Sequence, residues 1–150
     1  VPTDLAAIVK ESVKKFSNVA EKKQINIIFN NDAPDNFKVL VDINLFKRII
    51  INLIDNAIKY GNQNSDVVIT VDENKEGKGL IRISNYSEPI PQNILPKLFE
   101  RFYKTEYSRN RELGGIGLGL SIVKSIVELH AGSITVQSRE DGFIEFVITI

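Results

Sequence analysis

Four glycines crowd into the six positions from Gly114 to Gly119, and apolar residues at helical spacing follow them directly. This pattern predicts a glycine-rich loop that leads into an amphipathic helix ending near His130, with Ala131 and Gly132 as its terminator. Glycines let a backbone approach a ligand closely, and the free N–H groups at the start of a helix favour an anion such as phosphate. A plain helix entry needs only one glycine, so the sequence favours a phosphate-binding loop.

The chain has 150 residues, a formal net charge of zero, one histidine and no cysteine. This length suits a single domain with its own core. The balanced charge argues against a broad nucleic-acid or lipid-binding surface, and no apolar run reaches the length of a membrane span, so we expect neither nucleic acid nor direct membrane contact. Disulfides and the usual structural zinc sites are excluded. A start at Val1 without methionine suggests a fragment or a processed protein.

Apolar periodicity predicts three helices, at about 3–23, at about 42–60 and from the glycine-rich loop to about residue 130. Two short strands, at about 25–29 and 39–41, flank a turn-like NNDAPDN stretch and are expected to pair as a hairpin. The other expected strands span about 67–71, 80–83, 134–136 and 144–150.

The helix expected at about 42–60 carries an unusual polar edge. Asn52, Asn56 and Lys59 stand at offsets of four and seven, and Tyr60 flanks them. Asparagine is unfavourable inside a helix, yet two of them line up here. The edge is either an ordinary solvated face or a site in which the two amides bind a hard cation such as Mg²⁺ and the lysine binds phosphates.

Asn85 ends a strand on the same face as Ile81 and Ile83. A polar residue at the end of a core-facing row is either a strand cap or the floor of a pocket, and the strand alone leaves both open.

The stretch from Ser87 to Leu113 is irregular and contains three prolines. A long irregular segment directly before a phosphate loop is typical of a mobile lid. Its basic residues would cover a polyphosphate, although a charged run is more often simply solvated. These residues are Arg101, Lys104, Arg109 and Arg111.

His130 is the only histidine and therefore a tempting catalytic candidate. We expect a structural role, because a histidine in the last helical turn interacts favourably with the helix dipole and has no nucleophile or acid nearby in sequence.

Three motifs occur in order: NLIDNAIKY at Asn52–Tyr60, LFERFYK at Leu98–Lys104 and GGIGLGLSIVKSIVELHAG at Gly114–Gly132. With them the chain resembles the catalytic and ATP-binding domain of a two-component sensor histidine kinase over essentially its whole length. The resemblance implies a Bergerat (GHKL) α/β fold, an α+β two-layer sandwich of a mixed, mostly antiparallel sheet with three helices on one face and a mobile ATP lid at about 87–116. Residues 1–150 would be one domain, with the phosphoacceptor dimerisation domain and the sensor outside it.

Position by position, the resemblance implies ATP and Mg²⁺ as cofactors. Asn56 would be the principal Mg²⁺ ligand with Asn52 assisting, and Arg101 with Lys104 would reach the terminal phosphates. The implied catalytic residues are Asn52, Lys59, Arg101 and Lys104. The implied ATP-binding residues are Asn56, Lys59, Tyr60, Asn85, Ile90, Phe102, Gly115, Gly117, Leu118, Gly119 and Leu120.

One box departs from the family's pattern, and a second comparison concerns Asn52. Where these kinases commonly carry an aspartate that accepts a hydrogen bond from the adenine amino group, this chain has Asn85, followed by Ser87 and Pro89 in place of glycines. The asparagine still accepts but without charge assistance, so we expect weakened ATP binding. Hydrolysing relatives place a general-base glutamate where this chain has Asn52, so we expect negligible hydrolysis.

The resemblance therefore implies transfer of the γ-phosphate of ATP to a histidine on a separate helical-hairpin domain of the same kinase, for relay to a response regulator. The domain would not autophosphorylate alone, and it would be the cytoplasmic part of a bacterial inner-membrane sensor that is dimeric at full length. One alternative is a docking module that has lost nucleotide binding. Another is a related serine kinase of the anti-sigma type.

Overall fold

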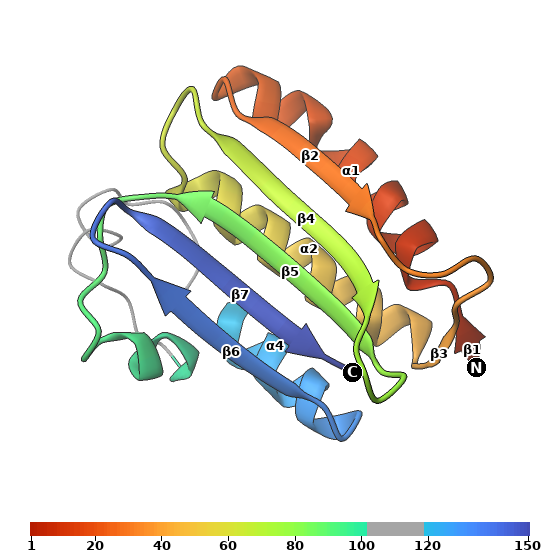
Figure 1. The fold of residues 1–150 in the computed structure, drawn as a ribbon. Coiled ribbons are helices and arrows are strands. Elements are labelled where there is room, and N and C mark those ends of the chain that lie inside the picture. The colour runs from red at the N-terminus through yellow and green to blue at the C-terminus, as the bar shows by residue number, and fades with distance from the viewer. Residues whose placement is uncertain (102–118) are drawn as a thin grey trace.

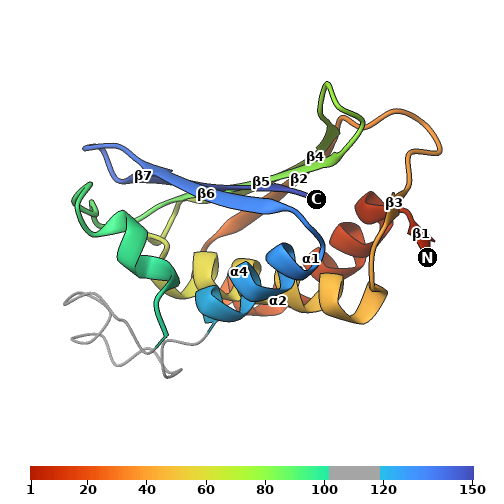
Figure 2. The same cartoon turned by 90° about the horizontal axis from the view of Figure 1, so that it is seen from below.

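The computed structural model describes residues 1–101 and 119–150. In this part of the chain, three α-helices cover one face of a five-stranded sheet, so the molecule has two layers (Figures 1 and 2). The helices are α1 (Leu5–Lys22), α2 (Ile43–Tyr60) and α4 (Gly119–Leu129), with a short 3-10 helix η1 (Leu95–Phe99). The strands are β1 (Pro2–Thr3), β2 (Asn26–Asn31), β3 (Val39–Leu40), β4 (Asp66–Glu73), β5 (Gly79–Tyr86), β6 (Ser133–Ser138) and β7 (Phe143–Thr149).

The main sheet has the strand order β2-β4-β5-β7-β6. Only β2 and β4 run parallel, and the other neighbouring pairs are antiparallel. In the centre of the sheet Ile83 lies opposite Ile69 on one side and opposite Phe146 on the other. The expected architecture, a mixed and mostly antiparallel sheet with three helices on one face, is confirmed.

The expected hairpin of the first two strands is wrong. Strand β3 pairs instead with the N-terminal β1, in the register Pro2↔Leu40 and Thr3↔Val39. Strand β2 pairs in parallel with β4, and a parallel pair needs a long crossover, which α2 supplies. The six residues of β2 find a longer and more apolar partner in β4, where Val67, Ile69 and Val71 are buried, than in the two residues of β3.

Both long helices begin at a capped residue. The Asp4 carboxylate accepts a hydrogen bond from the Ala7 backbone N–H at 3.2 Å, and the Asp42 carboxylate accepts one from the Leu45 N–H at 3.0 Å. Each cap satisfies a backbone donor that has no partner within the helix, an effect worth about 1 kcal/mol.

Helix α2 provides much of the core between the two layers. Its fully buried face turns toward the sheet, and the burial of each large aliphatic or aromatic side chain contributes roughly 1.5–3 kcal/mol. The buried residues, which recur at three- and four-residue steps, are Phe46, Ile49, Ile50, Leu53, Ile54, Ala57 and Ile58.

His130 joins α4 to α2. Its Nδ1–H donates to the Ile126 carbonyl oxygen at 2.8 Å, and its Nε2 accepts from the backbone N–H of Asp42 at 3.1 Å. The end of α4 therefore lies at the beginning of α2, and the two helices run antiparallel (Figure 2). The structural role expected for His130 agrees with these bonds.

Candidate functional site

The described candidate residues come mainly from α2, β5 and α4, and α2 and β5 end at the side of the molecule where α4 begins (Figure 1). His130 holds the far end of α4 beside Asp42. An α-helix rises about 1.5 Å per residue, so Gly119 lies roughly 16 Å from His130 along α4, in the direction of the C-terminal end of α2. This distance brings the start of α4 to the level of the segment between Asn52 and Asn56.

The polar edge of α2 is half-buried rather than fully solvated. Asn52, Asn56, Lys59 and Tyr60 all have intermediate exposure. Within the described residues, the side chains of Asn52 and Asn56 have no hydrogen-bond partner. Two amides in a helix interior that are partly removed from water and unused by the protein are available to a ligand, and their oxygens suit a hard cation.

Lys59 is engaged by a residue that the sequence analysis did not select. Its Nζ lies 3.0 Å from the Asp55 carboxylate, one helical turn earlier. The i, i+4 spacing of an acid and a lysine was the available sequence signal for this pair. Beside it, burial raises the pKa of Tyr60 above its ordinary value of 10.0, and the positive charge of Lys59 opposes that shift. The Tyr60 hydroxyl is therefore neutral and ready to donate a hydrogen bond.

The C-terminal end of α2 is held in place by two neighbouring elements. Lys23, just after α1, donates from its Nζ to the carbonyl oxygens of Ile58 at 2.6 Å and Lys59 at 2.7 Å. The backbone N–H of Asn62 donates to the carbonyl oxygen of Tyr86 at 2.7 Å. The second bond ties the end of α2 to the end of β5, and thus the segment carrying Tyr60 to the segment carrying Asn85.

Asn85 lies on the helix-facing side of β5 in one row with Ile81 and Ile83, as period two predicts. The residue is 5% exposed, and its side chain forms no hydrogen bond with the described residues. A strand cap would use this amide to satisfy backbone groups. Within the described residues, Asn85 forms no hydrogen bond of the kind that a strand cap would make.

The segment from Ser87 to Arg101, the first part of the expected lid, packs on the end of the sheet. Ser138 Oγ donates to the Ile90 carbonyl oxygen at 3.0 Å, and the ring of Phe99 meets that of Phe146 edge-on at 6.0 Å. Ile90 is half-buried in this contact, whereas Arg101 is exposed. The candidate residues Ile90 and Arg101 thus belong to a segment that is anchored on β6 and β7.

The glycine-rich loop lies largely outside the described residues. The expected site residues Phe102, Lys104, Gly115, Gly117 and Leu118 fall in this range. Two others open α4. Gly119 is exposed, and a Cβ placed on it would meet no atom of the described residues within 4 Å. Leu120 is half-buried and packs against the core.

Acidic metal ligands do not cluster in this part of the fold. Over residues 1–101 and 119–150, no three His, Cys, Asp or Glu side chains stand together as they would to hold a metal ion. A magnesium ion at the α2 edge would therefore be held by one or two amide oxygens and by oxygens of a bound ligand, an arrangement that Mg²⁺ tolerates well.

None of the described helices is long and apolar enough to cross a membrane.

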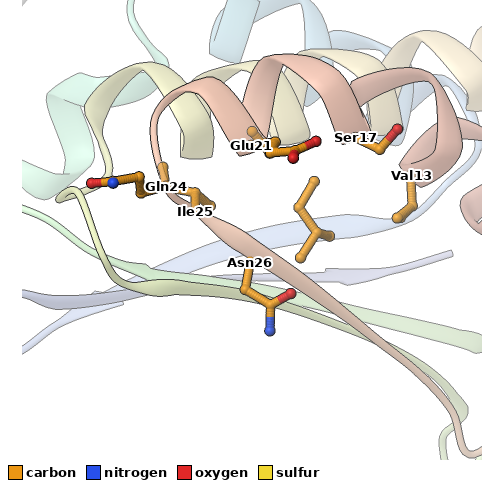
Figure 3. A pocket seen from close by; sticks show the side chains of 8 residues that line it. Val13, Ser17, Glu21, Gln24, Ile25 and Asn26 are labelled. Atoms are coloured by element: carbon orange, nitrogen blue, oxygen red, sulfur yellow. The ribbon is translucent and has the colours of Figure 1, made fainter.

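A groove of about 450 Å³ lies elsewhere, between the second half of α1 and the edge strand β2 (Figure 3). None of the expected site residues lines it. Its walls consist of Val13, Ser17, Ala20, Glu21, Gln24, Ile25, Asn26 and Ile27. The expected site and this groove are therefore separate features.

Comparison with known proteins finds a matching family and relatives of this chain. Residues 41–150 match the family described as histidine kinase-, DNA gyrase B- and HSP90-like ATPases. The sensor-like histidine kinase SenX3 of Mycolicibacterium smegmatis is 35% identical over 98% of this chain, which covers 38% of SenX3. The sensor histidine kinase TmoS of Ectopseudomonas mendocina is 31% identical over 98% of this chain, which covers 15% of TmoS. The chain thus spans less than two fifths of the length of these curated relatives.

Solved structures give the same picture of the fold. The nucleotide-free catalytic domain of the histidine kinase ThkA superposes with a TM-score of 0.85 at 28% identity, covering 100% of this chain and 93% of that one. ThkA in complex with the response regulator TrrA gives a TM-score of 0.82, with 41% of that chain covered. Full-length ShkA in complex with AMPPNP, at 22% identity and a TM-score of 0.87 over 99% of this chain and 30% of that one, shares the fold.

Proposed function

The chain belongs to the family of histidine kinase-, DNA gyrase B- and HSP90-like ATPases, and on this premise we propose that it binds Mg-ATP and transfers the γ-phosphate to a histidine on a separate domain of the same sensor kinase. The observation that carries the proposal is the pair of half-buried amides of Asn52 and Asn56, which have no hydrogen-bond partner among the described residues and lie at the level where α4 begins. They offer oxygens to Mg²⁺, while the start of α4 offers backbone N–H groups to phosphate.

The remaining site residues have distinct roles in this proposal. Asn56 is the principal magnesium ligand and Asn52 assists it. Lys59 leaves Asp55 to meet the phosphates, and Tyr60 donates its hydroxyl nearby. The buried amide of Asn85 meets the purine base, with Ile90 and Leu120 as apolar walls.

The chemistry needs positioning and charge neutralisation more than it needs a base. Phosphoryl transfer depends mainly on alignment of the triphosphate and on compensation of its charge. The position where hydrolysing relatives have a general base is occupied here by Asn52, whose amide does not take up a proton at neutral pH. We therefore assign transfer to an acceptor imidazole, with little loss of ATP to water.

The acceptor, the partners and the cellular location belong to the longer protein. We place the acceptor histidine on a helical-hairpin dimerisation domain, and the next recipient of the phosphate on a response regulator. The complex of ThkA with TrrA supports the latter for a relative of the same fold. The sensor histidine kinases among the relatives support a cytoplasmic position for this domain, beneath a bacterial inner-membrane sensor.

Calorimetric titration of the 150-residue chain with AMPPNP, with and without Mg²⁺, tests the nucleotide site. We expect metal-dependent binding in the wild type and at least about a tenfold loss in Asn56→Ala, since a ligand group is removed. Asn44→Ala is the matched control, because Asn44 is an exposed asparagine in the first turn of the same helix. Equal losses in both variants, or silence in the wild type, would refute the site, and silence would favour a docking module.

Transfer is tested separately, by mixing the chain and ATP with the rest of the kinase supplied as a second polypeptide. Acid-labile phosphate on a histidine of that polypeptide, and none on this chain alone, is the expected result. Acid-stable phosphoserine on a partner would instead identify the serine-kinase alternative.

A further inference from the structure

The side chain of Asn85 is buried within a rigid backbone but is not oriented by the protein. The segment around it is held from both sides, because the Tyr86 carbonyl oxygen accepts from Asn62 N–H at 2.7 Å and the Ser87 N–H donates to the Gly142 carbonyl oxygen at 2.9 Å. Ser87 and Gly142 are so close that a Cβ on Gly142, whose φ is +93°, would overlap the Ser87 carbonyl oxygen. The position of Asn85 is therefore fixed.

The amide at this position is nevertheless unengaged. Its row neighbour Ile83 and its cross-strand neighbour Ile144 are apolar, and no hydrogen bond joins its side chain to a described residue. Among the described residues no fully buried side-chain nitrogen or oxygen lacks a partner, so the amide retains part of the small exposed area of Asn85. The described residues therefore leave the orientation of the amide to be set by a bound ligand.

A free carboxamide matches two opposite hydrogen-bonding patterns. It carries one acceptor oxygen and an NH₂ donor, and the terminal torsion that exchanges them is broad and two-fold. A 6-aminopurine such as adenine presents a donor at position 6 and an acceptor at N1, whereas a 6-ketopurine presents an acceptor and then a donor. One amide orientation pairs with the first edge and the flipped orientation pairs with the second. An aspartate would only accept at neutral pH, and it would repel the keto oxygen.

We propose that Asn85 makes the nucleotide site tolerant of the purine 6-position, so that the domain binds 6-ketopurine nucleoside triphosphates as well as ATP. This inference rests on the proposed nucleotide site. It turns an asparagine that would merely weaken ATP binding into a residue that determines base specificity.

Titration of the 150-residue chain with Mg-ATP and with Mg-ITP tests the inference. ITP is the appropriate probe because it carries the keto group and the N1–H without the additional 2-amino group of guanine. We expect dissociation constants for the two nucleotides within about tenfold of each other, since the same number of hydrogen bonds is available to both. In Asn85→Asp we expect ITP to bind roughly 10- to 100-fold more weakly than ATP, which is the discrimination of one well-placed hydrogen-bonding pair.

The outcomes separate the two proposals. ATP binding with ITP more than tenfold weaker in the wild type would overturn the inference and leave the nucleotide site intact. Failure of the wild type to bind ATP would refute the nucleotide site itself. A thermal melt of Asn85→Asp establishes whether the variant is folded. If the variant does not fold, the ratio of the ATP and ITP affinities of the wild type still tests the inference.

Discussion

The substitutions Gly119→Ala and Gly132→Ala should change the stability of the domain in opposite directions, although Gly119 begins helix α4 and Gly132 lies just beyond its end. A Cβ on Gly119 meets no atom of residues 1–101 or 119–150 within 4 Å. On Gly132 it would overlap the Thr149 carbonyl oxygen and lie 3.2 Å from Val127 Cγ1. Because alanine is favoured over glycine in a helix, Gly119→Ala should raise the free energy of unfolding by roughly 0.5–1 kcal/mol. Gly132→Ala forces the backbone of β7 to move and should lower it by roughly 1–3 kcal/mol.

Thermal and urea denaturation measure this contrast. For a domain of this size 1 kcal/mol corresponds to a change in Tm of about 2–4 °C. Gly119→Ala should therefore melt about 1–4 °C above the wild type, and Gly132→Ala about 2–12 °C below it. ATP affinity should show the reverse order. The methyl group at Gly119 occupies space that the proposed site reserves for phosphate, so we expect at least about a tenfold loss there and near wild-type affinity in folded Gly132→Ala.

Two results would refute this reasoning. A Gly119→Ala variant as destabilised as Gly132→Ala would mean that the space above Gly119 is filled in solution. A Gly119→Ala variant that is stabilised and binds ATP with wild-type affinity would mean that phosphate does not approach the backbone at the start of α4.

Three further predictions follow from contacts around the site. His130→Ala removes the bonds to Ile126 and Asp42 and should lower the free energy of unfolding by about 1–2 kcal/mol in urea; an unchanged midpoint would show that water replaces both bonds. The raised pKa of Tyr60 means that the folded state retains a proton that the unfolded state releases, so the free energy of unfolding should fall as the pH rises above 10.0. The variant Tyr60→Phe should reduce that fall. Identical pH profiles of the two proteins would contradict the burial of the hydroxyl. The Asp55–Lys59 pair is partly exposed, with 42% of the Asp55 side chain and 36% of the Lys59 side chain accessible. The variant Asp55→Asn should therefore change the free energy of unfolding by less than about 0.5 kcal/mol. A loss above about 1 kcal/mol would show that the pair is buried.

The parts of the fold that follow from local periodicity could be predicted from the sequence. The buried face of α2 and its cap at Asp42 follow from 3.6-residue spacing and from a short acidic side chain before an apolar run. Strand pairing could not be predicted in the same way. Whether β2 pairs with β3 or with β4 depends on which partner buries more apolar surface once α2 has crossed over, and that competition involves residues more than 35 positions apart.

For the candidate site, residue types were predictable and their engagement was not. The alignment of Asn52 with Asn56 and the facing of Asn85 follow from helix and strand geometry. The bond from Lys23 to the end of α2 spans 35 positions in sequence, and it has no periodic signature. Nor does sequence reveal that the Asn85 amide has no hydrogen-bond partner in the described part of the fold, because that depends on every element packed around it.

The attachment of α4 through His130 has a mechanical consequence for the opposite end of that helix. His130 is hydrogen-bonded to Asp42, and Gly119 lies at the other end of the same helix, about 16 Å away. A tilt of α4 by about 4° about its His130 end would move Gly119 by about 1 Å. A displacement of that size in an aligned reaction centre costs on the order of 100-fold in rate. If the proposed nucleotide site is correct, a change in the tilt of α4 at its His130 end would therefore alter the rate of phosphate transfer at the other end of the helix.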